Sequence, residues 1–155
     1  QYIVNNDKFQ EIGVCVLDLN FYAYFMNLKA AHRNWVGGSV TKAPIFLKHD
    51  PHFFTDNRES LPRVLNAGWH FSWLGGAEKV YEKSFACIEP YDKSAIPPKE
   101  EYIKHFNEHF KKEKKTFIHI ENLSKEGIEF IQTPFNESYP VFIKENFQNF
   151  QKYFI

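Results

Sequence analysis

Cysteine and methionine are scarce in this chain, which has two Cys and one Met among 155 residues. Cys15 and Cys87 stand far apart, and neither has a second cysteine nearby. This spacing excludes a disulfide scaffold and a clustered-cysteine zinc motif. The low count fits a reducing compartment.

Neither sign of charge is in excess, because 19 basic residues balance 19 acidic ones. Proteins that bind along a nucleic-acid backbone usually carry a basic excess. Long apolar runs are also missing, and none approaches the roughly 18 residues that a membrane-spanning helix needs. We therefore expect no nucleic-acid partner and no transmembrane segment.

Several familiar catalytic signatures are absent, namely the P-loop, GxGxxG, HExxH and GxSxG. Asp18-Leu19-Asn20 superficially resembles an Asp-x-Asp metal motif. It lies inside an apolar segment and lacks the second carboxylate, which favours a structural role over a metal site.

Aromatic residues are plentiful, making up 18% of the chain, with 17 Phe. A chain of this length buries roughly 70% of the surface of its unfolded form, so much of this content belongs to a core. Trp and Tyr also form platforms for sugars and bases. We expect a single domain over residues 1–155.

Strand patterns prevail in the first half of the chain. Residues 13–26 are mostly apolar and rich in Val, Phe and Tyr, which predicts a buried strand or strand pair. Gly37-Gly38 predicts a turn, and residues 40–47 predict a short strand. The polar segment 48–62 predicts a loop, and residues 64–74 predict another short strand.

Helical patterns prevail in the second half. Residues 77–86 predict a helix, 89–98 a linker, and 99–115 an amphipathic helix with a solvated basic end. Residues 116–124 predict a strand and then a loop. Pro140 opens a closing helix with one apolar face, made of Ile143, Phe147, Phe150 and Phe154. Strands with helices between and after them predict an α/β fold, with a mixed sheet and flanking helices.

The stretch from residue 67 to 89 contains chemically versatile side chains. If one strand continues through Trp73, then Trp69 and Trp73 share one face, and His70 lies on the other face with Ser72. His70 is either a satisfied core histidine or a site residue. Glu78, in the first turn of the predicted helix, either complements the helix dipole or acts as an acid–base group.

This stretch, "NAGWHFSWLGGAEKVYEKSFACIE", resembles the pattern of glycosyltransferase family 17. In that pattern, Ala-Gly-Trp-His-x-Ser precedes Gly-Gly, a Glu and a Lys, and then Ser-Phe-x-His-x-Glu. The family includes β-1,4-mannosyl-glycoprotein β-1,4-N-acetylglucosaminyltransferase-like enzymes and bacterial and viral relatives. Upstream, "FYAYFMNLK" and "NWVGGSV" are similar to the family's Tyr-rich strand and Trp-x-Gly turn, and "YPVFIKENFQNFQKYFI" is similar to its closing helix.

The resemblance implies that the chain is the C-terminal portion of a longer, GT-A-like glycosyltransferase, with its N-terminal donor half and Asp-x-Asp-Glu metal motif upstream. It implies transfer of N-acetylglucosamine from UDP-GlcNAc to a glycan acceptor, with inversion and with a divalent metal, Mn²⁺ or Mg²⁺. The alternatives are a non-catalytic glycan-binding domain and an interaction domain whose aromatic residues are all core. The low cysteine count and the lack of an apolar anchor favour a cytoplasmic bacterial or viral setting over the Golgi lumen.

The resemblance also implies roles for individual residues. Glu78 is the preferred catalytic base, and His70 contacts the diphosphate or is the base instead. The residues expected to bind substrate are Trp35, Arg58, Arg63, Trp69, Ser72, Trp73, Gly75, Gly76 and Lys83. Among these, the tryptophans are expected to stack on sugars, and the cations either neutralise phosphate or are ordinary solvated charges.

One position departs from the family pattern. Cys87 stands where the family has the histidine of His-x-Glu, while Glu89 matches the pattern. A thiolate suits Mg²⁺ or Mn²⁺ poorly, so the sequence leaves metal dependence open at these two positions.

Overall fold

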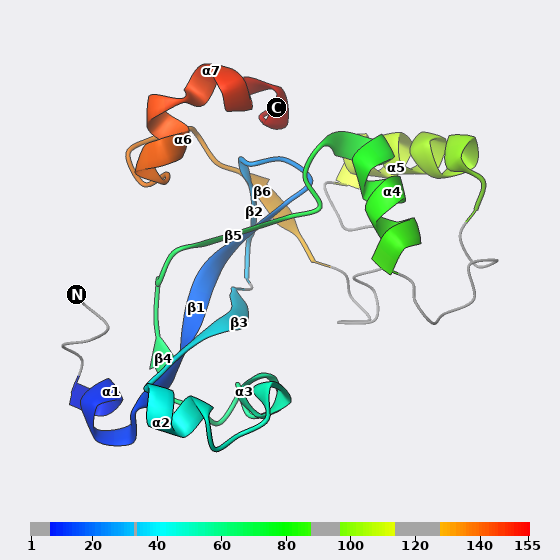
Figure 1. The fold of residues 1–155 in the computed structure, drawn as a ribbon. Helices are drawn as coiled ribbons and strands as arrows, with labels where there is room; N and C mark the ends of the chain where they lie inside the picture. The colour runs from blue at the N-terminus through cyan, green and yellow to red at the C-terminus, as the bar shows by residue number, and fades with distance from the viewer. Residues whose placement is uncertain (1–6, 33, 88–96, 114–127) are drawn as a thin grey trace. The chain divides into compact units, whose positions relative to one another are not determined.

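The computed structural model describes residues 7–32, 34–87, 97–113 and 128–155 (Figure 1). These residues divide into two compact units. The described part of the first unit is 7–20 and 34–70, and the second unit takes 21–32 and the described residues from 71 onward. Strand β1 (Val14–Ala23) contributes to both units. The expectation of a single domain stays a prediction.

The first unit is built on a mixed sheet. Strand β3 (Trp35–Thr41) pairs antiparallel with β1, from Val14 opposite Thr41 to Leu19 opposite Trp35. Strand β4 (Arg63–Val64) pairs parallel with β1. The predicted buried strand over 13–26 is confirmed for its central ten residues, and so is the expectation of a mixed sheet.

The predicted turn at Gly37-Gly38 is wrong, because both glycines lie inside β3. Gly38 lies opposite Leu17, whereas the next residue of β1, Asp18, lies opposite Val36. Gly37 is therefore the extra residue of a β-bulge. A Cβ at Gly37 would collide with the Trp35 indole, so this glycine serves close packing instead of chain reversal.

Short helices flank this sheet: α1 (Asp7–Ile12), α2 (Ala43–Phe46) and α3 (Pro51–Asp56). The strand predicted over 40–47 is wrong beyond Thr41, because α2 begins there with a proline in its first turn. The predicted loop over 48–62 contains α3, whose N-cap Asp50 accepts a hydrogen bond from the His52 amide at 2.8 Å. The core of the unit is formed by Phe9, Cys15 and Val64, with Leu17, Val40 and Ala67 against it.

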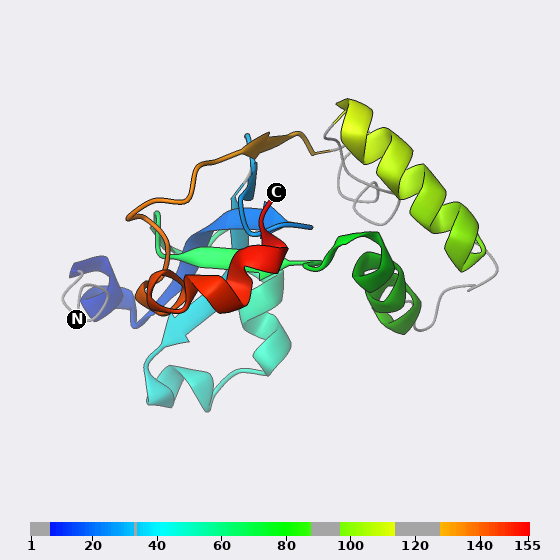
Figure 2. The same ribbon diagram turned by 90° about the horizontal axis from the view of Figure 1, so that it is seen from above.

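The second unit contains an antiparallel sheet and two longer helices. The end of β1 pairs with β2 (Leu28–Ala30), which pairs with β6 (Phe130–Gln132). Helix α4 (Gly76–Cys87) confirms the helix predicted over 77–86, and α5 (Lys99–Glu113) confirms the helix predicted from residue 99 as far as the described residues reach. The two helices pack against each other (Figure 2). The predicted basic end of the second helix lies outside the described side chains. Tyr102 and Phe106 of α5 are only 1% and 2% exposed.

The closing segment is broken into short pieces: α6 (Val141–Glu145), α7 (Phe147–Phe150) and the 3₁₀ turn Gln151–Tyr153. The prediction of one continuous helix is wrong, because Asn146 leaves helical geometry at φ −117° and ψ 27°. Three of the four side chains predicted to share one apolar face, Ile143, Phe150 and Phe154, pack in one cluster with Tyr22, Met26, Tyr139, Phe71, Leu74 and Tyr153. The fourth, Phe147, stacks on Phe135 instead.

Two sequence predictions concern residues that are not described. The strand predicted over 116–124 lies outside the described residues, and so does most of the linker over 89–98. Among the helices that the structure describes, none combines the length and apolarity needed to cross a membrane.

Candidate functional site

The segment that carries the family resemblance forms strand β5 (Trp69–Ser72), which pairs with β1. The strand predicted over 64–74 is split, because Asn66 and Gly68 have φ of 51° and 146° and separate β4 from β5. At the other end, Trp73 has a left-handed φ of 57°. Such a conformation costs a non-glycine residue about 1–2 kcal/mol.

The predicted alternation from Trp69 to Trp73 is therefore wrong. Trp73 lies outside strand β5 and has a left-handed backbone conformation. The alternation of side chains along the strand therefore does not place Trp73 on the same face as Trp69. The division of the chain also falls here: His70 belongs to the first unit, and Phe71 begins the next part of the second. Each group of candidate residues is consequently described within its own unit.

In the first unit, the structure brings together two predicted residues that are distant in the sequence. The imidazole of His70 stacks on the indole of Trp35, with ring centroids 4.5 Å apart and planes inclined by 8°. Gly37 provides space for the indole to lie close to the backbone of β3. Both rings are half-buried, and Trp69 is 39% exposed. His70 is thus not a fully buried core histidine.

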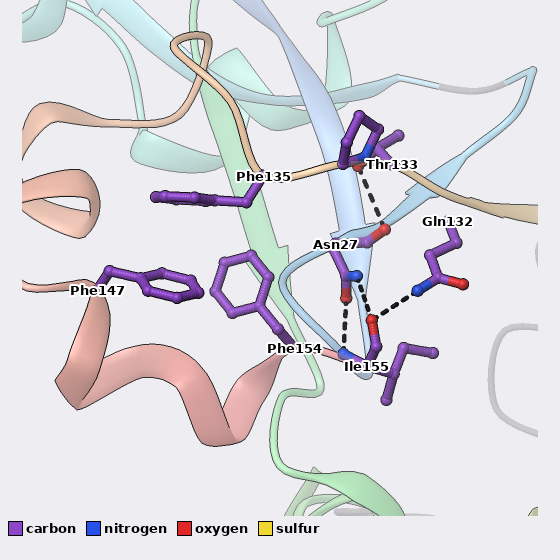
Figure 3. Close-up of a pocket in the computed structure, with 8 residues that line it drawn as sticks. Asn27, Gln132, Thr133, Phe135, Phe147, Phe154 and Ile155 are labelled. Carbon is purple, nitrogen blue, oxygen red and sulfur yellow. Dashed lines mark hydrogen bonds between the residues drawn. The ribbon is translucent and has the colours of Figure 1, made fainter.

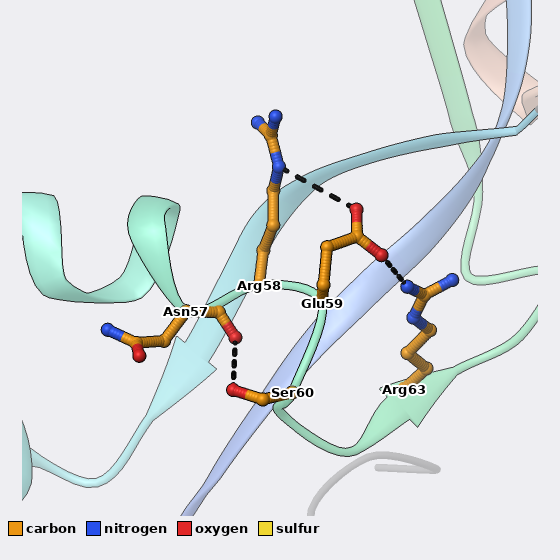
Figure 4. Close-up of polar contacts among 5 residues, drawn as sticks. All are labelled: Asn57, Arg58, Glu59, Ser60 and Arg63. Atoms are coloured by element: carbon orange, nitrogen blue, oxygen red, sulfur yellow. Dashed lines mark hydrogen bonds and ion pairs between the residues drawn. The ribbon is translucent and has the colours of Figure 1, made fainter.

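The two candidate arginines of this unit share one acidic partner (Figure 4). The Arg63 guanidinium donates to one carboxylate oxygen of Glu59, and Arg58 Nε lies 4.0 Å from the other. A hydrogen bond from Ser60 Oγ to the Asn57 carbonyl, 2.9 Å long, closes the turn that carries Arg58 and Glu59, while Arg63 begins β4. Surface ion pairs of this kind contribute little to stability. The arrangement favours the alternative that these arginines are ordinary solvated charges.

In the second unit, three predicted residues meet. The Lys83 ammonium of α4 lies 3.2 Å from the Ser72 hydroxyl and 4.7 Å from the centroid of the Trp73 indole. An ammonium over an indole is a favourable cation–π arrangement. Lys83 and its partners thus form a small polar and aromatic cluster, with a cation at its exposed side.

The Gly-Gly turn leads directly into α4. Gly75 and Gly76 have φ of 106° and 74°, and the Gly75 amide donates to the Tyr24 carbonyl at 3.2 Å. Glu78 lies in the first turn of the helix. Its side chain is 67% exposed, and one carboxylate oxygen lies 3.6 Å from Lys99 Nζ.

The resemblance assigns Cys87 and Glu89 to the position of a metal ligand pair. Cys87 is the last residue of α4, and Glu89 lies outside the described residues. Within the described ranges, no three His, Cys, Asp or Glu side chains come close enough together to hold a metal. Mg²⁺ and Mn²⁺ are held by several oxygen ligands, and Glu89 is not among the described residues, so the divalent metal stays a prediction.

Asp18 differs from the other acidic residues of the described chain. It is 7% exposed, and its Oδ1 has no hydrogen-bond partner among the described residues. A buried oxygen of this kind normally has a partner. Among the residues that the structure describes, Asp18 belongs to no group of three possible metal ligands, so the Asp-x-Asp resemblance gains no support there.

The sequence did not reveal a pocket in the second unit, lined by Asn27, Gln132, Thr133, Pro134, Phe135, Phe147, Phe154 and Ile155 (Figure 3). Its volume is about 480 Å³. The lining comes from segments that are distant in sequence, and none of them has a recognisable motif. The one available signal was the high phenylalanine content.

Comparisons with protein-family models, with curated proteins and with solved structures gave no match to this chain.

Proposed function

We propose that the chain is the C-terminal portion of a GT-A-like glycosyltransferase, which transfers N-acetylglucosamine from UDP-GlcNAc to a glycan acceptor with inversion. The observation that carries the proposal is the cluster of Lys83, Ser72 and Trp73. The family resemblance implies a substrate-binding role for each of these residues. Their contact places a cation, a hydroxyl and an indole at one point of the second unit.

The proposed reaction needs a stabilised leaving group. The acceptor oxygen bonds to the anomeric carbon while the bond from that carbon to the diphosphate breaks, and the bonding electron pair leaves with UDP. A cation near the departing diphosphate lowers the energy of this charge separation. The Lys83 ammonium has this role in our proposal, and the Trp73 indole offers an apolar face to a sugar ring.

The reaction also needs a base for the proton of the acceptor hydroxyl. Glu78 is our preferred base, since its carboxylate is 67% exposed and therefore accessible to an acceptor. Lys99, at 3.6 Å, compensates its charge in the absence of substrate. His70 is the alternative base, with its imidazole oriented by the stack on Trp35.

A matched pair of lysines on α4 tests the role of the cation. In the complete enzyme, Lys83→Met should lower transfer from UDP-GlcNAc by about 10-fold or more, as the loss of a charged contact to the transition state would. Lys79→Met should leave transfer within about twofold, because Lys79 pairs with Glu82 at 2.6 Å instead. UDP release, measured with Mn²⁺ present, is the readout. Equal effects of the two variants would remove Lys83 from the mechanism.

Glu78→Gln tests the base. It preserves the shape of the side chain and should abolish transfer while circular dichroism shows an unchanged fold. Full turnover by this variant would leave His70 as the candidate base. Absence of turnover with every UDP-sugar, together with no UDP binding by calorimetry, would contradict the enzyme proposal.

The second candidate is a non-catalytic glycan-binding domain. The exposed indole of Trp69, at 39%, favours it, because such surfaces bind sugar rings without chemistry. Glycan binding that is lost in Trp69→Ala, in a protein that shows no transfer, would support this function.

A further inference from the structure

The pocket of the second unit has the size and composition of a ligand site. Its volume of about 480 Å³ lies within the range of small-molecule sites, about 300–1,000 Å³. The lining residues come from the turn after β1, from the end of β6 and the segment after it, from the start of α7, and from the two residues after the 3₁₀ turn (Figure 3). None of the residues that we assign to transfer lines it.

One wall consists of three phenyl rings that hold one another in place. Phe135 stacks on Phe147 with centroids 4.3 Å apart. The Phe154 ring makes edge-on contacts with both, and its centroid lies 5.5 Å from that of Phe135 and 5.2 Å from that of Phe147. Because these contacts are already made without a ligand, the wall is preformed. Phe135 is 37% exposed and presents apolar ring surface.

The remaining part of the lining is polar, and hydrogen bonds hold it in place. The Asn27 amide donates to the Ile155 carbonyl at 2.7 Å and accepts from the Ile155 amide at 3.1 Å. Gln132 Nε2 donates to the same carbonyl at 2.6 Å, and the Thr133 amide donates to the Asn27 carbonyl at 2.8 Å. Figure 3 shows these groups around Ile155, beside the phenyl rings.

The side chains that line the pocket are uncharged, and the polar ones are carboxamides and a hydroxyl, which suit hydroxyl groups of a ligand. A pyranose ring combines an apolar C–H face with polar hydroxyls at its edge. Phenyl surface fits the first feature, while carboxamide and hydroxyl groups fit the second. We propose that this pocket binds a pyranose ring of an uncharged glycoside, with its C–H face against Phe135 and its hydroxyls toward Gln132 and Thr133.

Binding by the full chain can be measured with methyl β-N-acetylglucosaminide as the probe. Amide shifts in ¹H–¹⁵N NMR spectra should change at Gln132, Thr133 and Ile155 as the probe is titrated. Glucuronic acid, a charged pyranose, should bind more weakly. Neither measurement involves a sugar nucleotide, so the result is independent of whether the protein transfers sugars.

Two variants and a control examine the walls separately. Phe135→Leu should weaken binding about 3- to 10-fold, the factor that corresponds to one aromatic contact. Gln132→Ala changes an exposed side chain and should weaken binding without affecting the fold. Phe142→Leu is the control, because Phe142 is 66% exposed and does not line the pocket.

Shifts confined to the pocket, with binding weakened in Phe135→Leu and in Gln132→Ala but unchanged in Phe142→Leu, would support the proposal. Shifts elsewhere in the chain, or no shifts at all, would overturn it. Indole is a neutral aromatic probe, and its binding at these residues without any response to the sugar would overturn the assignment to a pyranose.

Discussion

Single residues of this protein depart from ordinary packing where strands meet. Asp18 has a carboxylate oxygen without a hydrogen-bond partner among the described residues, at the position where β1 and β3 shift register. Cys15, in the same strand, is buried, and burial raises the pKa of its thiol. The unpartnered oxygen of Asp18 lowers stability, whereas the raised pKa makes the Cys15 thiol a weak nucleophile at neutral pH.

Replacing Asp18 should make the protein more stable. A buried polar atom without a partner costs about 1–3 kcal/mol, and a β-branched side chain suits a strand. We expect Asp18→Val to raise the free energy of unfolding by about 1 kcal/mol in urea titrations, without a change in the m-value. Asp56→Ala, at an exposed position of α3, is the control and should stay within about 0.5 kcal/mol. A loss of stability in Asp18→Val would show that the carboxylate has a stabilising partner.

At the scale of elements, α4 is the best specified part of the site. The turn before it needs left-handed backbone at Gly75 and Gly76, and a buried serine, Ser84, donates to the Val80 carbonyl at 2.8 Å within the helix. Ser84 also lies 3.4 Å from the Tyr102 hydroxyl of α5. The helix is therefore held both by its own entry turn and by its neighbour, and this fixes where Lys83 meets Ser72.

The two glycines of the turn should differ in how well they tolerate alanine. A Cβ at Gly76 has no neighbour closer than 4.0 Å, so only its backbone conformation opposes the change, at about 1–2 kcal/mol. A Cβ at Gly75 would approach the Lys79 side chain to 2.7 Å, and its φ of 106° is foreign to L-residues. Urea titration should show a larger loss of stability for Gly75→Ala than for Gly76→Ala. The reverse order would contradict the turn as described.

At the scale of the whole molecule, stability should depend on alkaline pH through buried phenols. Burial raises the pKa of Tyr22, Tyr102 and Tyr139 above that of a free tyrosine. Hydrogen bonds from neighbouring hydroxyl groups oppose this effect only in part. All three residues lie in the second unit.

Whether stability rises or falls with pH depends on which state, folded or unfolded, loses its tyrosine protons at the lower pH. Below the pKa of free tyrosine, about 10, both states are protonated and stability is complete. Above it the unfolded chain ionises first, so the free energy of unfolding falls as pH rises through the raised pKa of the folded protein. Urea titrations followed by circular dichroism at a series of alkaline pH values should show this loss of stability. Tyr102→Phe should make the loss less steep, and an equally steep loss in Tyr102→Phe would contradict the prediction.

The extent to which the sequence predicted the fold differs between local and distant features. The capping signal of Asp50-Pro51 was present in the sequence and would have predicted α3 inside the expected loop. The bulge at Gly37 had no such signal, because a glycine that permits close packing looks the same in sequence as one that permits a turn. Within the candidate site, the sequence selected Lys83, Ser72 and Trp73, but it placed Trp73 on a strand that ends before it.

By itself the sequence determined the elements whose pattern is local: the apolar strand β1 and the helices α4 and α5. Strand β1 is a mostly apolar run of ten residues, and the two helices continue for 12 and 15 residues, so each gives a signal that can be recognised within one segment. Only the tertiary structure decided the stack of His70 on Trp35, the contact of Lys83 with Trp73, the burial of Asp18 and the pocket beside Asn27. Each of these depends on strand register and on close approach between distant segments, which the spacing of residues along one segment does not encode.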